Sequence, residues 1–305
     1  MRILFLHNNF PGQYRRLMRA FADDRSIDML AGTLASNKQE VPVKRVLYEP
    51  HRALTKGIHP VAASLESAAI TAQAAYKALS PVKARGWKPD VICAHSGWGP
   101  SLFLKELWPD TKLIPYFEWF YRSTGSDADF LERDNRNEND RVRTLSKNAP
   151  ILFDLAAMDW GVCPTVWQRS QFPDLFRDRI SVAHDGVDTD TLVPDDHARL
   201  DLNGMSFSRD DEVLTYVARN LEPYRGFPVF MEALAILQKQ RPKLQTIIVG
   251  GDGVSYGGKR NDGKTHKQAA LDDFELDESR IHFTGLVPFP TFRNTLQFTA
   301  LFYIF

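Results

Sequence analysis

Short apolar runs alternate along most of the chain with longer segments in which apolar residues recur at helical spacing. The runs are rich in β-branched and aromatic residues, which predicts buried strands. In the first two thirds of the chain they occupy residues 2–7, 27–31, 41–48, 91–95, 113–117, 160–163 and 180–183. The helical patterns occupy residues 14–21, 59–79, the stretch that ends at 107, and 151–158. Strands that alternate with helices in this way are typical of a parallel α/β sheet.

The same alternation restarts after residues 192–209, which lack periodicity and carry Pro, Asp, Asn and Gly. Strands are predicted there at 213–218, 244–249, 281–283 and 300–305, with helices that begin near 226, 265 and 288. Thr265 and Gln268 have the spacing of a capping box for the middle helix. We therefore expect two domains, residues 1–190 and residues 210–305, with the boundary between them.

Composition and charge place the chain among ordinary soluble proteins. Apolar residues make up 43% and charged residues 25% of the sequence. The 38 basic and 38 acidic residues cancel, which gives no electrostatic reason to expect a nucleic-acid partner. No secretory segment and no apolar run long enough to span a bilayer is visible. Cys93 and Cys163 each end an apolar run, which indicates reduced core thiols and a cytoplasmic location.

A candidate anion site lies between residues 213 and 226, where a strand, a polar turn and a helix start follow one another. Arg219 begins the turn, and Arg225 with Gly226 ends it. A helix N-terminus after a strand presents N–H groups and a positive dipole end to an anion. Two guanidiniums would add donors suited to phosphate oxygens. The alternative is a pair of solvated loop arginines.

Polar and aromatic residues also gather at the predicted ends of two strands in the first domain. His95 ends the strand VICAH, and Glu118 directly follows the strand at 113–117. Parallel strands deliver such residues to one crevice at the carboxyl edge of the sheet. The nearby aromatic residues are Trp98, Trp119 and Tyr121. Aromatic faces can stack on sugars or bases, although a core histidine and core aromatics are the alternative.

A glycine run, Gly250 to Gly253, follows the strand at 244–249. It approaches a dinucleotide-binding pattern, but Tyr256 occupies the last glycine position of GxGxxG. A nicotinamide-dependent enzyme is therefore disfavoured.

Seven segments along the chain carry a resemblance through their order and spacing. They are MRILFLHNNFPGQY, PDVICAHSGWGPSLFLKELWP, CPTVWQRSQFP, HDGVDTDTLVP, YVARNLEPYRGF, IIVGGDGVSYG and IHFTGLVP. Together they resemble a family 4 glycosyltransferase of GT-B fold. The resemblance implies an α/β protein with two facing Rossmann-like domains built on parallel sheets. It also implies that the second domain holds most of a nucleotide-sugar donor and is incomplete here.

The resemblance assigns roles to particular residues. Arg219 and Arg225 would hold the donor diphosphate, with Arg225 in place of the usual lysine. Gly12 loosely matches a glycine that approaches the donor phosphate, and His95 matches a histidine near the transferred sugar. The expected catalytic residues are thus His95, Arg219 and Arg225, and the donor-binding residues Gly12, Arg219, Arg225, Gly226, Gly250 and Gly251. Trp98, Glu118 and Asp185 are expected near the acceptor or the sugar.

The implied activity is retaining, metal-independent transfer of a hexosyl-type sugar to an acceptor hydroxyl, in cell-surface glycan, polysaccharide or glycoconjugate synthesis. No cofactor is expected, because the nucleotide sugar is a substrate. The acceptor would be a glycan, a lipid-linked molecule or a small molecule, and peripheral membrane contact stays open. Asp127-Ala128-Asp129 imitates a metal-binding DxD but lacks a preceding buried strand, and Asp188-Thr189-Asp190 is a similar pair. Neither is assigned a metal.

Two alternatives remain at this stage. One is a nucleotide-sugar epimerase or another GT-B enzyme that does not transfer to an acceptor. The other is a catalytically silent nucleotide-binding fragment. The resemblance implies that paired glutamates bind the donor sugar and the ribose, and their segment would follow the strand at 300–305. On that ground we expect a truncated chain with weak diphosphate binding, little transferase activity and a tendency to aggregate.

Overall fold

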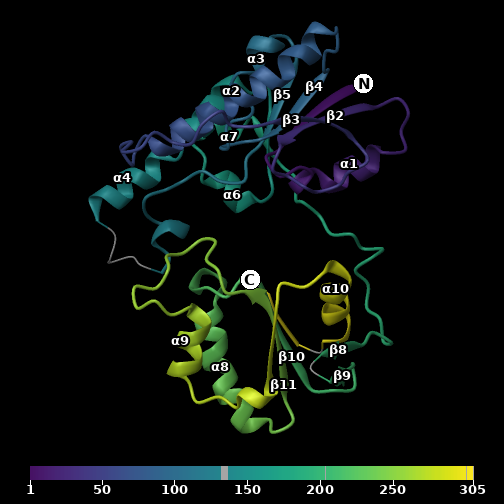
Figure 1. The fold of residues 1–305 in the computed structure, drawn as a ribbon, viewed down its shortest axis with the longest axis vertical. Helices are drawn as coiled ribbons and strands as arrows, with labels where there is room; N and C mark the ends of the chain where they lie inside the picture. The colour runs from purple at the N-terminus through teal and green to yellow at the C-terminus, as the bar shows by residue number, and fades with distance from the viewer. Residues whose placement is uncertain (132–136, 203, 300, 305) are drawn as a thin grey trace. The chain divides into compact units, whose positions relative to one another are not determined.

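A computed structural model describes residues 1–131, 137–202, 204–299 and 301–304 of the chain. It divides into two compact units, Met1–Gly186 and Val187–Phe305. Each is an α/β unit with its own parallel sheet (Figure 1). Within the described residues, every helix is too short or too polar to cross a bilayer.

The first unit is built on a seven-stranded parallel sheet in the order β3-β2-β1-β4-β5-β6-β7. Its strands are β1 (Arg2–Leu6), β2 (Asp28–Leu34), β3 (Lys44–Tyr48), β4 (Val91–His95), β5 (Lys112–Tyr116), β6 (Gly161–Cys163) and β7 (Ile180–Val182). Its helices are η1 (Gly12–Tyr14), α1 (Arg15–Phe21), α2 (Ala63–Ala84), α3 (Leu104–Leu107), η2 (Asp127–Asp129), α4 (Glu138–Ser146), α5 (Ala149–Ala157), α6 (Val166–Ser170) and α7 (Asp174–Arg177). The strand order steps outward from β1 in both directions, which places the β1 and β4 ends at a topological switch point.

Helices cover both faces of this sheet because successive strand residues point to opposite sides. Leu4 and Leu6 of β1 pack with α2 and α3, whereas Phe5 packs with Tyr14 of η1 and Met18 of α1. A strand buried on both faces has to be apolar throughout, and the four residues ILFL that follow the exposed Arg2 meet that requirement.

The second unit has a four-stranded parallel sheet in the order β12-β11-β10-β13. Its elements are β8 (Leu200–Leu202), β9 (Met205–Phe207), β10 (Val213–Asn220), η3 (Pro223–Arg225), α8 (Phe227–Gln240), β11 (Gln245–Gly251), α9 (His266–Asp273), η4 (Glu278–Arg280), β12 (Ile281–Gly285), α10 (Phe289–Phe298) and β13 (Leu301–Ile304). Figure 1 shows α8 and α9 on one side of β10 and β11, and α10 with β8 and β9 on the other. The predicted strand at 300–305 is present as β13, and its end residues lie outside the described ones.

Three local expectations need correction. The segment 192–209 looked unstructured, but it contains the antiparallel pair β8–β9, whose Leu200 and Phe207 are buried against the sheet. Strands this short give too few positions for a period to be visible. The long helix begins at Ala63 rather than at residue 59 and continues through Pro81 to Ala84. The helix that ends at Leu107 is only one turn long.

Candidate active site

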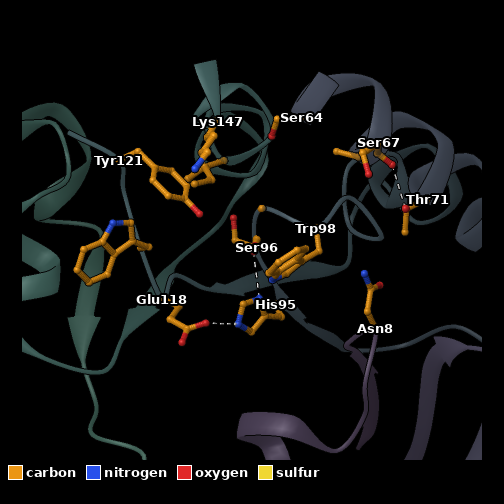
Figure 2. Close-up of a pocket in the computed structure, with 14 residues that line it drawn as sticks. Asn8, Ser64, Ser67, Thr71, His95, Ser96, Trp98, Glu118, Tyr121 and Lys147 are labelled. Atoms are coloured by element: carbon orange, nitrogen blue, oxygen red, sulfur yellow. Dashed lines mark hydrogen bonds and ion pairs between the residues drawn. The ribbon is translucent and has the colours of Figure 1, made fainter. Parts of the chain in front are cut away.

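A cavity of about 410 Å³ opens in the first unit at the carboxyl ends of β1, β4 and β5. This volume lies in the range of ligand pockets, which run from about 300 to 1,000 Å³. Its lining residues are Asn8, Ser64, Ser67, Ala68, Thr71, His95, Ser96, Gly97, Trp98, Glu118, Trp119, Tyr121, Lys147 and Ile151 (Figure 2). His95 and Glu118, which the sequence placed at one crevice with Trp98 nearby, therefore line one cavity with Trp98.

His95 is only 3% exposed and faces a hydrogen-bond acceptor at each ring nitrogen. Nδ1 lies 3.1 Å from the carbonyl oxygen of Ser96, and Nε2 lies 3.1 Å from a carboxylate oxygen of Glu118 (Figure 2). A neutral ring can donate to only one of these acceptors, whereas a ring protonated at both nitrogens donates to both. The hydrogen bond from His95 lowers the pKa of Glu118, so Glu118 is a carboxylate at neutral pH.

His7, which sequence reasoning passed over, packs directly against His95. Its ring meets the His95 ring edge to face, with the centroids 4.9 Å apart. The backbone N–H of Asn9 donates to Nδ1 of His7, so Nε2 carries the proton and donates to Gln13 at 2.9 Å. Burial, with a further contribution from His95, lowers the pKa of His7 to about 4. His7 is therefore a neutral ring that fixes the loop after β1.

Gly12 closes this loop over His7. A Cβ added to Gly12 would lie 2.4 Å from Nε2 of His7, and its φ of +46° is in the region that favours glycine. The structure thus supplies a packing reason for glycine at the position that the resemblance linked to a donor phosphate. The signal in the sequence was the run His-Asn-Asn directly after an apolar strand.

Asp154 on α5 anchors the loop that follows His95, and sequence reasoning also missed it. It is fully buried and accepts hydrogen bonds from the hydroxyls of Ser96 at 2.7 Å and Ser101 at 2.6 Å, and from the N–H of Gly97 at 3.4 Å. Burial raises the pKa of this carboxyl to about 6. Gly99 in the same loop has a φ of +100°, and a Cβ there would lie 2.1 Å from a backbone oxygen of α2. The loop is therefore held between two helices.

Aromatic side chains form much of the cavity wall. Trp98 is 59% exposed, and the Lys147 ammonium lies 5.0 Å from the centre of the Tyr121 ring. Trp119 stacks at a tilt against Trp167, with centroids 5.2 Å apart. The indole N–H of Trp119 is buried, and no acceptor for it occurs among the described residues. Exposed aromatic faces beside hydroxyls and an amide are the kind of surface that binds sugar rings.

Asp185 lies beside this region but is not one of the cavity-lining residues. Its carboxylate accepts a hydrogen bond from Tyr116 at 2.7 Å, and its carbonyl accepts one from Arg16 at 2.6 Å. Tyr116 in turn packs against His95, with ring centroids 5.5 Å apart. Asp185 is thus connected to His95 through the Tyr116 ring.

The predicted strand, turn and helix around the two arginines form in the second unit. Arg219, near the end of β10, is exposed, and no hydrogen bond or ion pair to its side chain occurs among the described residues. Arg225 ends η3, and its guanidinium carbon lies 4.5 Å from the centre of the Tyr256 ring. Gly226 has a φ of +69° and caps α8. Both guanidiniums therefore belong to one turn at the carboxyl edge of the sheet.

The N-terminus of α8 offers fewer donors than the sequence suggested. The N–H of Gly226 bonds to the carbonyl of Pro223, and the N–H of Phe227 points to the carbonyl of Glu222 at 3.4 Å. The next residue, Pro228, has no N–H. Any anion at this turn would therefore depend chiefly on the arginines.

Gly250 and Gly251 at the end of β11 have a packing role. A Cβ on Gly250 would lie 2.8 Å from the carbonyl oxygen of Ala218, and one on Gly251 would lie 2.9 Å from the Asn220 side chain. Only glycines allow β11 to approach the arginine turn this closely. Among the described residues, no group of three or more His, Cys, Asp or Glu side chains could hold a metal ion.

The sequence profile of the glycosyl transferase family 4 group matches residues 25–192, more than half of the chain. The chain belongs to this family. The resemblance expected from the sequence is therefore confirmed. No curated protein sequence matches significantly.

Solved structures agree with this family assignment at the level of fold. Sucrose-phosphate synthase from Thermosynechococcus elongatus superposes with a TM-score of 0.63 at 13% identity, covering 99% of this chain and 74% of that one. A putative UDP-N-acetylglucosamine 2-epimerase from Listeria monocytogenes gives a TM-score of 0.57 at 12% identity, with 99% and 73% covered. An E. coli trehalose-6-phosphate structure bound with UDP-2-fluoro glucose gives 0.55 at 12% identity, with 99% and 77% covered. This chain therefore has the GT-B type α/β fold that was predicted from its sequence.

Proposed function

We propose that the chain transfers a sugar from a nucleoside diphosphate donor to an acceptor hydroxyl. The observation that carries this proposal is the pair Arg219 and Arg225 at one turn of the second unit. Arg219 has no partner among the described residues, and the Nε of Arg225 is buried without one. Guanidiniums without carboxylate partners are suited to bind a diphosphate. Membership of a glycosyltransferase family supports the same reaction class.

In the proposed step, the bond between C1 of the sugar and a diphosphate oxygen breaks, and its electron pair leaves with the nucleoside diphosphate. The acceptor oxygen bonds to C1, and the hydroxyl proton passes to the departing diphosphate. Arg219 and Arg225 stabilise the negative charge that develops on the leaving group. Retention of configuration and a hexosyl donor are part of the proposal and rest on the family.

The cavity of the first unit is the proposed acceptor-side site. Trp98 and Tyr121 provide faces for a sugar ring, and the indole N–H of Trp119 provides a donor without a partner among the described residues. His95, held by Glu118, orients the group that reacts. We propose an acceptor that is a glycan, a lipid-linked molecule or a small molecule, in glycan or glycoconjugate synthesis. The donor is a substrate, so no cofactor is proposed.

Calorimetric titration with UDP, GDP and ADP, and with the corresponding nucleosides, tests the donor site. Arg219→Ala should weaken diphosphate binding by about 1.5–3 kcal/mol, the scale of a hydrogen bond to a charged group. Nucleoside binding should barely change. Lys243→Ala is the matched control, because Lys243 is an exposed cation before the start of β11, at the opposite edge of the sheet. Failure of all three diphosphates to bind, or an equal loss for nucleosides, would overturn the proposal.

A further inference from the structure

Glu222 is a fully buried carboxylate beside the arginine turn, and nothing in the sequence marked it. Its Oε2 atom accepts three backbone hydrogen bonds, from Ser255 at 3.0 Å, Tyr256 at 3.0 Å and Gly257 at 3.2 Å. Oε1 is buried with no partner among the described residues. A buried carboxylate is costly unless its hydrogen bonds hold it, so three donors on one oxygen form a strong local restraint.

The same residue is also part of the arginine turn. Its carbonyl oxygen accepts the N–H of Arg225 at 3.0 Å. Next to it, the N–H of Leu221 donates to the carbonyl of Gly251, and the Asn220 amide donates to the Ser255 hydroxyl at 2.5 Å. Glu222 therefore ties the turn at 219–226 to the loop at 255–257 through both its backbone and its side chain.

The held loop carries the aromatic ring on which Arg225 lies. The guanidinium carbon of Arg225 is 4.5 Å from the centre of the Tyr256 ring, although Tyr256 is 59% exposed. A guanidinium stacked on a ring face keeps its N–H edge available for hydrogen bonds in the plane of the group. The ring thus limits the directions in which Arg225 can present its donors.

We propose that Glu222 and Tyr256 are positioning residues for the donor diphosphate, an inference that rests on the proposed function. Glu222 holds the 255–257 loop against the arginine turn, and Tyr256 in that loop orients the Arg225 guanidinium. Arg219 has no such support among the described residues, so the two arginines differ in preorganisation. Arg225 offers a fixed donor pair, whereas Arg219 closes on the ligand when it binds.

The alternative is that Glu222 only stabilises the fold, and Tyr256 separates the two cases. Its side chain is mostly exposed, so Tyr256→Leu should leave the melting temperature of the chain unchanged. It should weaken binding of the tightest diphosphate among UDP, GDP and ADP roughly 3- to 30-fold, the range expected for a cation–π contact. Tyr256→Phe keeps the ring and should restore the affinity. Binding of the corresponding nucleoside should stay unchanged in both variants.

Glu222→Gln tests the restraint itself. The variant keeps one acceptor oxygen but loses the charge, so amide hydrogen exchange at residues 255–257 should become faster, and diphosphate binding should weaken about tenfold or more. Glu232→Gln on the exposed face of α8 is the matched control and should change neither.

The outcomes separate this inference from the proposed function. If wild type binds a diphosphate and Tyr256→Leu binds it equally well, the positioning role is wrong while the proposed function stands. If amide hydrogen exchange at residues 255–257 is unchanged in Glu222→Gln, Glu222 does not restrain this loop. If wild type binds none of the three diphosphates, both proposals fall together.

Discussion

Replacing Asp154 by Asn removes the ionisable group that accepts the hydrogen bonds of Ser96, Gly97 and Ser101, with little change in shape. Burial raises the pKa of Asp154 from its ordinary 3.8 to about 6. Between these values the folded state binds more protons than the unfolded state. The stability that this group contributes is therefore fully present below pH 3.8 and is lost as the pH rises through about 6. Asn does not titrate and shows no such loss.

The magnitude follows from the two pKa values. At 1.36 kcal/mol per pKa unit, the full difference corresponds to about 3 kcal/mol, of which about 2–2.5 kcal/mol falls between pH 4 and pH 7. His7 acts in the opposite direction, because its pKa is lowered to about 4 and its contribution is lost as the pH falls from 6.5 through that value. In wild type the two dependences nearly cancel. Both proteins contain His7, so its contribution cancels when the unfolding free energy of wild type is subtracted from that of Asp154→Asn. The remaining pH dependence is that of Asp154.

Urea unfolding followed by tryptophan fluorescence measures this difference. All six tryptophans lie before residue 187, so the signal reports on the first unit. The unfolding free energy of Asp154→Asn minus that of wild type should rise by about 2–2.5 kcal/mol from pH 4 to pH 7. Asp23→Asn, at an exposed position, is the matched control. A flat difference for Asp154→Asn would mean that the serine hydroxyls and the Gly97 N–H fully offset the burial of the charge.

Three further predictions concern the first unit. Gly99→Ala should cost about 3 kcal/mol or more in urea unfolding, because its Cβ would meet a backbone oxygen at 2.1 Å, whereas Gly86→Ala, with a φ of +82° but open space, should cost about 1 kcal/mol. His95→Ala should leave diphosphate affinity nearly unchanged and lower the transfer rate by about 10²-fold or more, and loss of folding instead would indicate a purely structural histidine. Trp98→Ala should raise KM for the acceptor several-fold with little effect on the donor, while Trp160→Ala, at a tryptophan that is 45% exposed and lies outside the cavity, should change neither.

The sheets were predictable because parallel strands buried on both faces must be apolar throughout. That signal located β1, β4, β10 and β11, but not the short pair β8–β9. The carboxyl ends of neighbouring parallel strands share an edge of the sheet, so His95 and Glu118 could be predicted to lie close together. Both line the same cavity. His95 and Glu118 could be identified from the sequence because they lie at the ends of strands.

The buried carboxylates were not predictable in this way. Asp154 lies within a helix and Glu222 within a polar turn, and in both places an isolated acid usually faces solvent. Their roles come from partners 53 to 58 residues away for Asp154 and 33 to 35 residues away for Glu222. No short-range pattern encodes such contacts. Likewise, Gly250 and Gly251 are glycines because β10 approaches them closely. A glycine motif alone does not show whether the close neighbour is another strand or a ligand.

Following the fate of C1 of the donor sugar tests the proposed transfer most directly. The chain would be incubated with UDP- and GDP-hexoses labelled with ¹³C at C1, together with a panel of saccharide and lipid-linked acceptors, and the products would be followed by NMR and mass spectrometry. We expect one nucleoside diphosphate released for each new glycoside formed, with the anomeric configuration at C1 retained. A sugar epimerised at C2 with no acceptor product would instead identify an epimerase and contradict the proposed function.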